Sequence, residues 1–134
     1  MHRIFLTAGI VISVLAIIAF SHCLRDADGK TDIEIKPAPI HEVDIRIAES
    51  YPEQIFVYIK GGLADGCTSL KNITTEKDGN IINITVTVQR PKDAICIQVY
   101  SFFEESVNLG SDFIRGQSYT VNVNGTAIEF TYPL

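Results

Sequence analysis

A period-two alternation of apolar and polar residues recurs through residues 41–134 and limits, more than any other feature, the folds open to this chain. Residues 82–89 alternate without a break between Ile or Val and Asn, Thr or Gln, and residues 43–47 and 119–124 follow the same rule. Alternate residues of a strand point to opposite faces, whereas a helix repeats about every 3.6 residues. The alternation therefore predicts half-buried strands, and it leaves room for a helix only briefly near Glu104–Asn108.

Turn signals separate the predicted strands from one another. Asp78-Gly79-Asn80 and Asn124-Gly125 are typical of tight hairpins. Arg90-Pro91-Lys92-Asp93 marks another turn, after which a strand is predicted at Ala94–Phe103. About seven short strands with no long helix between them favour an all-β fold, namely a β-sandwich of the immunoglobulin-like or fibronectin-like kind.

One tyrosine supports this class of sandwich. Gly116–Val123 resembles the penultimate strand of immunoglobulin-like and fibronectin-like domains, and Tyr119 stands where such domains have a tyrosine that ties back to an upstream loop. The chain has no Trp, and its cysteines are not placed as the usual pair between sheets. We therefore expect the architecture of an immunoglobulin domain without membership of that family.

A set of short motifs spans most of the predicted domain. They are Pro39-Ile40, Gly62–Thr68, Gln89-Arg90-Pro91, Gln98-Val99-Tyr100, Val107–Gly110 and Gly116–Gly125. With these motifs, residues 38–133 resemble a group of uncharacterised small exported proteins of prokaryotes, lipoprotein-like, with an immunoglobulin-like sandwich. The resemblance implies a fold and a location in the cell envelope, and it transfers no catalytic residue.

Residues 1–23 have the layout of an export signal or membrane anchor. Met1-His2-Arg3 gives a positive start, and the apolar stretch Ile4–Phe20 carries no charge. Three fates follow: lipid attachment at Cys23 after cleavage, cleavage after Ser21 to give a secreted form, or retention as an anchor, since about 20 residues span a bilayer. Each of them delivers the remainder of the chain outside the cytoplasm.

Residues 24–40 are predicted to be a polar, proline-containing tether. The stretch Leu24–Asp32 is rich in charge, and Lys36-Pro37-Ala38-Pro39 is a stiff spacer, because proline fixes its own φ and restrains the residue before it. The predicted sandwich is then residues 41–134. We expect this domain to be monomeric once it is freed from the membrane.

Cys67 and Cys96 are the two cysteines of the predicted domain, and we expect them to form a disulfide. Export supports this pairing, because disulfides form and persist outside the cytoplasm. The closed loop of about 30 residues would contribute roughly 3–4 kcal/mol in the chain-entropy model. Two buried thiols or one reactive thiol are the alternatives.

Two features near strand ends are candidates for recognition. Gly61-Gly62-Leu63-Ala64-Asp65-Gly66 is predicted to be a glycine-rich loop, held in shape by Cys67 at its edge. Phe102-Phe103 is a candidate aromatic anchor, because strand alternation buries one ring and exposes its neighbour. The alternative is that both rings pack in the core and the glycines only turn the chain.

Composition and motifs argue against most other functions. A net charge of −5 without a basic cluster argues against nucleic acid. His41 is the one histidine after residue 22, and no nucleophile elbow, zinc-ligand pattern or nucleotide-binding loop accompanies it. We therefore expect a binding module of the envelope, not an enzyme, with no metal or cofactor and a protein or glycan partner. The alternatives are a glycan-acting hydrolase that uses carboxylates, and a protease inhibitor that presents the 61–66 loop.

Overall fold

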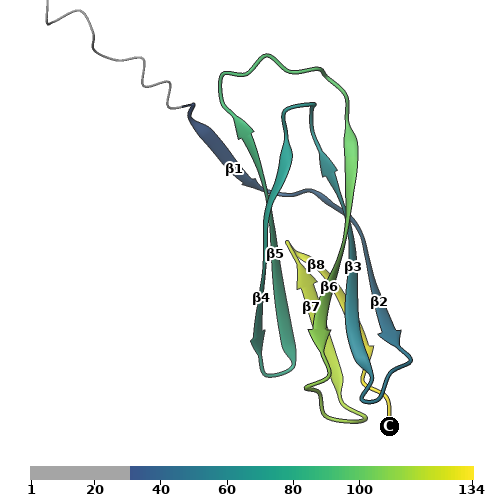
Figure 1. Ribbon diagram of the computed structural model, residues 1–134. Helices are drawn as coiled ribbons and strands as arrows, with labels where there is room; N and C mark the ends of the chain where they lie inside the picture. The colour runs from purple at the N-terminus through teal and green to yellow at the C-terminus, as the bar shows by residue number, and fades with distance from the viewer. Residues whose placement is uncertain (1–30) are drawn as a thin grey trace, which may run out of the picture. The chain divides into compact units, whose positions relative to one another are not determined.

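The computed structural model describes residues 31–134, and within them the chain is all β (Figure 1). Residues 1–30 lie outside the described part, and with them the predicted export segment, Cys23 and most of the tether. No helix among residues 31–134 is long and apolar enough to cross a membrane. Eight strands are present: β1 (Ile33–Pro37), β2 (Ile40–Ala48), β3 (Gln54–Leu63), β4 (Ser69–Asp78), β5 (Ile81–Pro91), β6 (Ser101–Gly110), β7 (Ser118–Val123) and β8 (Thr126–Thr131).

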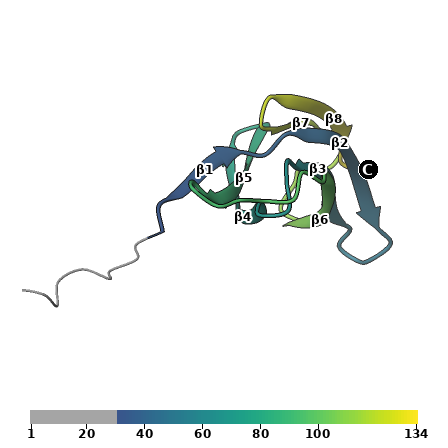
Figure 2. The ribbon, with the colours of Figure 1, turned by 90° about the horizontal axis from the view of Figure 1, so that it is seen from above.

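The strands form two sheets around one core, so the fold is a β-sandwich (Figure 2). The first sheet has the order β1-β5-β7-β8, with β4 paired to the other edge of β5, and the second has the order β2-β3-β6. β5 is the axis of the first sheet. Its second half pairs with β1, and residues Ile81–Ile84 pair in parallel with β7.

The chain passes from one sheet to the other at Ala38, between β1 and β2. The Ala38 N–H donates to the carbonyl of Val86, 2.9 Å away. Asn124, at φ 47°, fills the gap that β1 and β7 leave along β5: its amide donates to the carbonyls of Ala38 and Val86 and accepts from the Val86 N–H. One side chain thus satisfies backbone groups for which no strand partner exists at this point.

The core includes the apolar residues of β5 and β7 that the period-two pattern predicted, whereas Ile47, from the alternating residues 43–47, is 41% exposed. Tyr119 is buried with them, and its hydroxyl accepts a hydrogen bond of 2.9 Å from the backbone N–H of Ile114, which is the predicted tie to an upstream loop. The most deeply buried side chains are Ile55, Val57, Ile59, Ile82, Ile84, Val86, Val121, Val123 and Tyr132.

Two expectations about the elements were wrong. Residues 33–37, predicted as tether, form β1, because Ile33 and Ile35 alternate with charged residues and pair with β5, so the sandwich begins before residue 41. The strand predicted at Ala94–Phe103 begins only at Ser101. Glu104–Asn108, where the sequence left room for a short helix, lies inside β6.

Candidate functional site

The segment Ala94–Tyr100, which connects β5 to β6, displays large apolar side chains to solvent. We call residues 95–99 the apolar segment. Ile95 is fully exposed, Ile97 is 74% exposed and Val99 is 57% exposed. The sequence predicted a strand with these three residues on one face, but no strand forms here and no sheet covers them. Isolated exposed aliphatics are ordinary, whereas a contiguous group of them marks an interaction surface.

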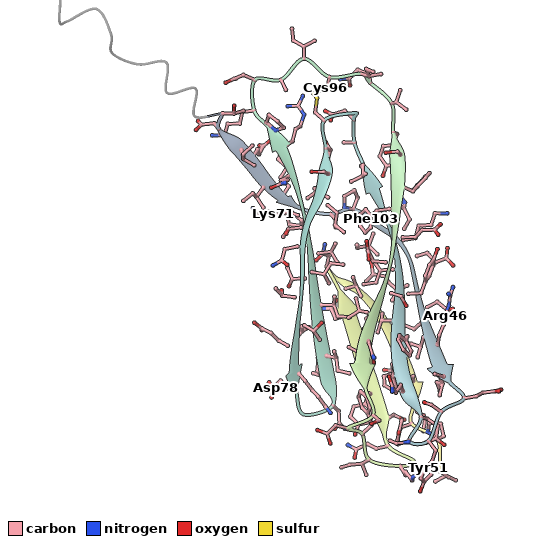
Figure 3. The ribbon with its side chains drawn as sticks, in the orientation of Figure 1. Arg46, Tyr51, Lys71, Asp78, Cys96 and Phe103 are labelled. Atoms are coloured by element: carbon pink, nitrogen blue, oxygen red, sulfur yellow. A yellow bond between two sulfur atoms is a disulfide. The ribbon has the colours of Figure 1, made fainter. Side chains whose placement is uncertain are left out.

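A disulfide holds the apolar segment against the turn between β3 and β4. Cys67 in that turn is bonded to Cys96 in the segment, as the sequence predicted, and Figure 3 shows Cys96 at one end of the sandwich. The Gly66 N–H also donates to the carbonyl of Ile97, 2.9 Å away. The segment is therefore a fixed part of the fold.

Arg90, at the end of β5, shapes the first half of the same segment. Its Nη1 donates to the carbonyls of Pro91 and Lys92, and its Nη2 donates to the carbonyl of Ala94 and contacts the Cys96 sulfur. Its Nε donates to Asp65 over 2.6 Å. Because every nitrogen of the guanidinium is occupied, Arg90 has a structural role that its place in a predicted turn did not reveal.

Asp65 completes this arrangement from the β3–β4 turn. One of its carboxylate oxygens binds Arg90, and the other accepts from the Cys67 N–H and the Thr68 hydroxyl. The hydrogen bond from Arg90, followed by that from Thr68, lowers the pKa of Asp65 to about 2. Asp65 lies near the sulfurs of Cys67 and Cys96, but these are bonded to each other and its oxygens are occupied, so the group does not have the free ligands of a metal site.

The predicted recognition loop 61–66 is largely not a loop. Gly61, Gly62 and Leu63 continue β3 and pair with β6, and Asp65 is buried. The glycines serve close approach and not a turn: a Cβ on Gly61 would collide with the ring of Phe103, and one on Gly62 with the hydroxyl of Tyr100. Of the six residues, Ala64 and Gly66 are exposed.

The two phenylalanines at the start of β6 separate, as strand alternation requires. Phe103 is buried in the core and is not available as an anchor, whereas Phe102 is 55% exposed. Phe102 packs edge to face with His41 and Tyr100 at ring-centroid distances of 5.4 Å. His41 Nε2 and the Tyr100 hydroxyl are 2.5 Å apart. We call His41, Tyr100 and Phe102 the aromatic cluster.

Comparison with known proteins places this fold in a family. The model of the ORF11 beta-sandwich domain matches residues 57–134, more than half of the chain. The chain belongs to this family. The matched range includes both disulfide cysteines, the apolar segment and Phe102.

Curated relatives come from the bacterium Herpetosiphon aurantiacus. An uncharacterised 10.2 kDa protein in the HgiCIIM 5′ region is 42% identical over 88 residues, which are 66% of this chain and 93% of the relative. Two more, in the HgiBIM and HgiEIM 5′ regions, are each 41% identical over 78 residues, 58% of this chain and 94% of the relative. No solved structure matches the chain.

A cavity of about 150 Å³ lies beside the site, between β1, the end of β3 and the second half of β5. Pockets for small ligands usually measure about 300–1,000 Å³, so this one has room for only a small group. Glu34 contributes a carboxylate to the lining, and it forms an ion pair of 3.0 Å with Lys36, which also lines the cavity. The cavity therefore lacks the two converging carboxylates that glycan hydrolysis needs.

Tyr58, on β3, is the other described residue with a shifted pKa. Burial, and then a hydrogen bond with Glu104, raise its pKa above the ordinary value. The phenol therefore stays neutral at physiological pH, and the Arg46 guanidinium lies 4.2 Å from the ring centroid. This stack is a surface contact between β2 and β3, and it offers no nucleophile.

Proposed function

We propose that this protein is a membrane-tethered binding module outside the cytoplasm, without catalytic activity, that recognises a protein partner through the aromatic cluster. The observation that carries the proposal is the exposure of the cluster beside a segment fixed by Arg90 and the disulfide: Phe102 is 55% exposed and Tyr100 is 48% exposed. Aromatic residues held on a rigid frame are typical anchors of protein interfaces.

Location in the cell envelope is supported by two independent features. The Cys67–Cys96 disulfide belongs to oxidising compartments. The uncharged apolar stretch Ile4–Phe20, after a positive start, suits export followed by anchoring, either as a span or through lipid on Cys23. The lipoprotein-like, exported character of the chain is part of this proposal.

The geometry of the rings favours a protein partner over a glycan. Sugars stack on ring faces that lie open and roughly coplanar. In the aromatic cluster the three rings meet at interplanar angles of 74–83°, and the Lys60 ammonium lies 5.1 Å from the centroid of Phe102. Such rings present edges as well as faces, which suit the side chains of a protein.

Binding is also favoured over the alternative functions. A hydrolase would need one carboxyl group with a raised pKa facing a second one, whereas the pKa of Asp65 is lowered and Glu34 is paired with a lysine. A protease inhibitor would need a protruding 61–66 loop, and half of those residues lie in β3. We further propose that the sandwich is related in architecture to immunoglobulin-like domains, which the hydrogen bond to the Tyr119 hydroxyl supports.

Site-specific photo-crosslinking tests the binding function. The photoreactive residue p-benzoyl-phenylalanine replaces Phe102 in the full-length protein in its native membrane, and a matched control carries it in place of Tyr51, which is 92% exposed at the other end of the sandwich (Figure 3). We expect an adduct of defined mass at position 102 only. Added wild-type protein should suppress this adduct, and added Phe102→Ser variant should not.

Two results would contradict the proposal. Equal yields of adduct at positions 51 and 102 would mean that the crosslinks arise from random collisions with other proteins. No adduct at position 102 would mean that the aromatic cluster has no partner in the membrane. The Phe102→Ser variant must melt at the wild-type temperature for the competition to count, which its exposed position leads us to expect.

A further inference from the structure

The apolar segment lies at the end of the domain where the described chain begins. The Asp32 carbonyl accepts a hydrogen bond of 2.9 Å from the Lys92 N–H, and the two side chains form an ion pair of 3.5 Å. Lys92 lies three residues before Ile95, the first residue of the apolar segment, and Figure 1 shows β1 beginning at the same end as the β5–β6 connection. The start of the described chain is therefore held to the same connection that carries the exposed isoleucines.

The length of the preceding chain limits how far this end can be from a membrane. The part of the sequence without Lys, Arg, Asp or Glu runs from Ile4 to Leu24, and Asp32 is already fixed to the domain. Eight residues span at most about 28 Å when fully extended. If residues 4–24 span the bilayer, or if lipid on Cys23 anchors the chain, the apolar end of the domain stays within about 30 Å of the lipid.

The chemistry of the segment suits the interface of a neutral bilayer. Ile95 and Ile97 have their side chains in water, and their charged neighbours Lys92 and Asp93 have opposite signs. Insertion would therefore depend on apolar surface and not on attraction to anionic lipid. The disulfide and Arg90 have already fixed the segment, so little conformational entropy remains to be lost on insertion.

We propose that Ile95 and Ile97 insert into the interfacial region of the lipid bilayer, so that the domain rests on the membrane with its apolar end down. This inference depends on the proposed tether. Because the tether makes the contact with the bilayer intramolecular, the inserted state is populated most of the time even if insertion is weak. The aromatic cluster, formed by β2, the start of β6 and Tyr100 just before β6, then faces a partner close to the membrane surface.

The absence of Trp from the sequence permits a direct test. Single-tryptophan variants Ile95→Trp and Tyr51→Trp of the full-length protein are reconstituted into phosphatidylcholine vesicles, with or without bromine on the acyl chains. Position 51 is the matched control, because it is as exposed as position 95 and lies at the opposite end of the domain (Figure 3). We expect blue-shifted emission and quenching by brominated lipid at position 95, unchanged in 0.5 M salt, and neither effect at position 51.

The outcomes separate the inference from the proposed function. Protein that floats with the vesicles but shows no quenching at position 95 refutes the membrane contact and leaves the tether intact; the segment then faces a protein or a second copy of the chain. Protein that does not float refutes both. Should Ile95→Trp fail to fold, Ile97→Trp provides the same measurement, and wild-type melting and an intact disulfide verify the fold of either variant.

Discussion

Removal of the Cys67–Cys96 disulfide should lower the stability of the whole domain, although the bond lies at one end of the sandwich. The two cysteines are 29 positions apart in the sequence, and β4 and β5 lie between them. Closing a loop of this length lowers the entropy of the unfolded chain by an amount worth about 3.6 kcal/mol at 25 °C. For a domain of this size, we expect the melting temperature to fall by about 15 °C.

Thermal melts followed by circular dichroism, with and without reductant, measure this change. The Cys67→Ser/Cys96→Ser variant is the matched control, because reductant should leave its melting temperature unchanged and equal to that of the reduced wild type. The loss should also appear as a lower urea midpoint, since the constraint acts on global unfolding.

Melting temperatures of the oxidised and reduced proteins within about 3 °C of each other would refute the reasoning. The disulfide would then not constrain the unfolded chain measurably. In the native state the hydrogen bonds of Arg90 would be enough to hold the apolar segment in place.

Three further substitutions test other parts of the fold. Asp65→Asn should destabilise the domain at neutral pH. Because the pKa of Asp65 in the folded protein, about 2, lies below the ordinary value of 3.8, the stabilisation by its carboxylate is present above about pH 4 and disappears as the pH falls to 2. The urea midpoints of variant and wild type should therefore converge in acid. Gly61→Ala should cost about 1–3 kcal/mol in urea denaturation because its Cβ meets the ring of Phe103, whereas Gly66→Ala, whose Cβ makes ordinary contacts, should be nearly neutral. Tyr119→Phe leaves a backbone N–H without its acceptor and should lower stability by about 1–3 kcal/mol, and a wild-type midpoint would show that water replaces the hydroxyl.

The sequence predicted the fold well where burial imposes a pattern. Residues 82–89 alternate because one face of β5 packs in the core and the other does not. The period of two therefore follows the division between buried and exposed side chains. Tyr119 and the two cysteines were also predictable, because their chemistry requires a partner.

The alternation of apolar and polar residues gave a wrong prediction where it did not arise from burial against a second sheet. Ile95, Ile97 and Val99 have the period of a strand, but a local pattern does not say whether a sheet exists to cover the apolar side. Gly61 and Gly62 suggested a flexible loop, whereas they make room for rings that come from residues about 40 positions away in the sequence. Arg90 was missed for the same reason, because its main partner, Asp65, is 25 residues distant.

The connections at the apolar end also determine how the domain would bear a mechanical load. A force between the proposed N-terminal tether and a partner at Phe102 would pass from Asp32 to Lys92 and then along the β5–β6 connection. The disulfide at Cys96 limits how far this connection can be displaced. This route runs over the surface and avoids the hydrogen bonds between the central strands. Tension would therefore first strain the five residue pairs of β1 with β5 and the contact at Phe102, while the apolar core stays unloaded.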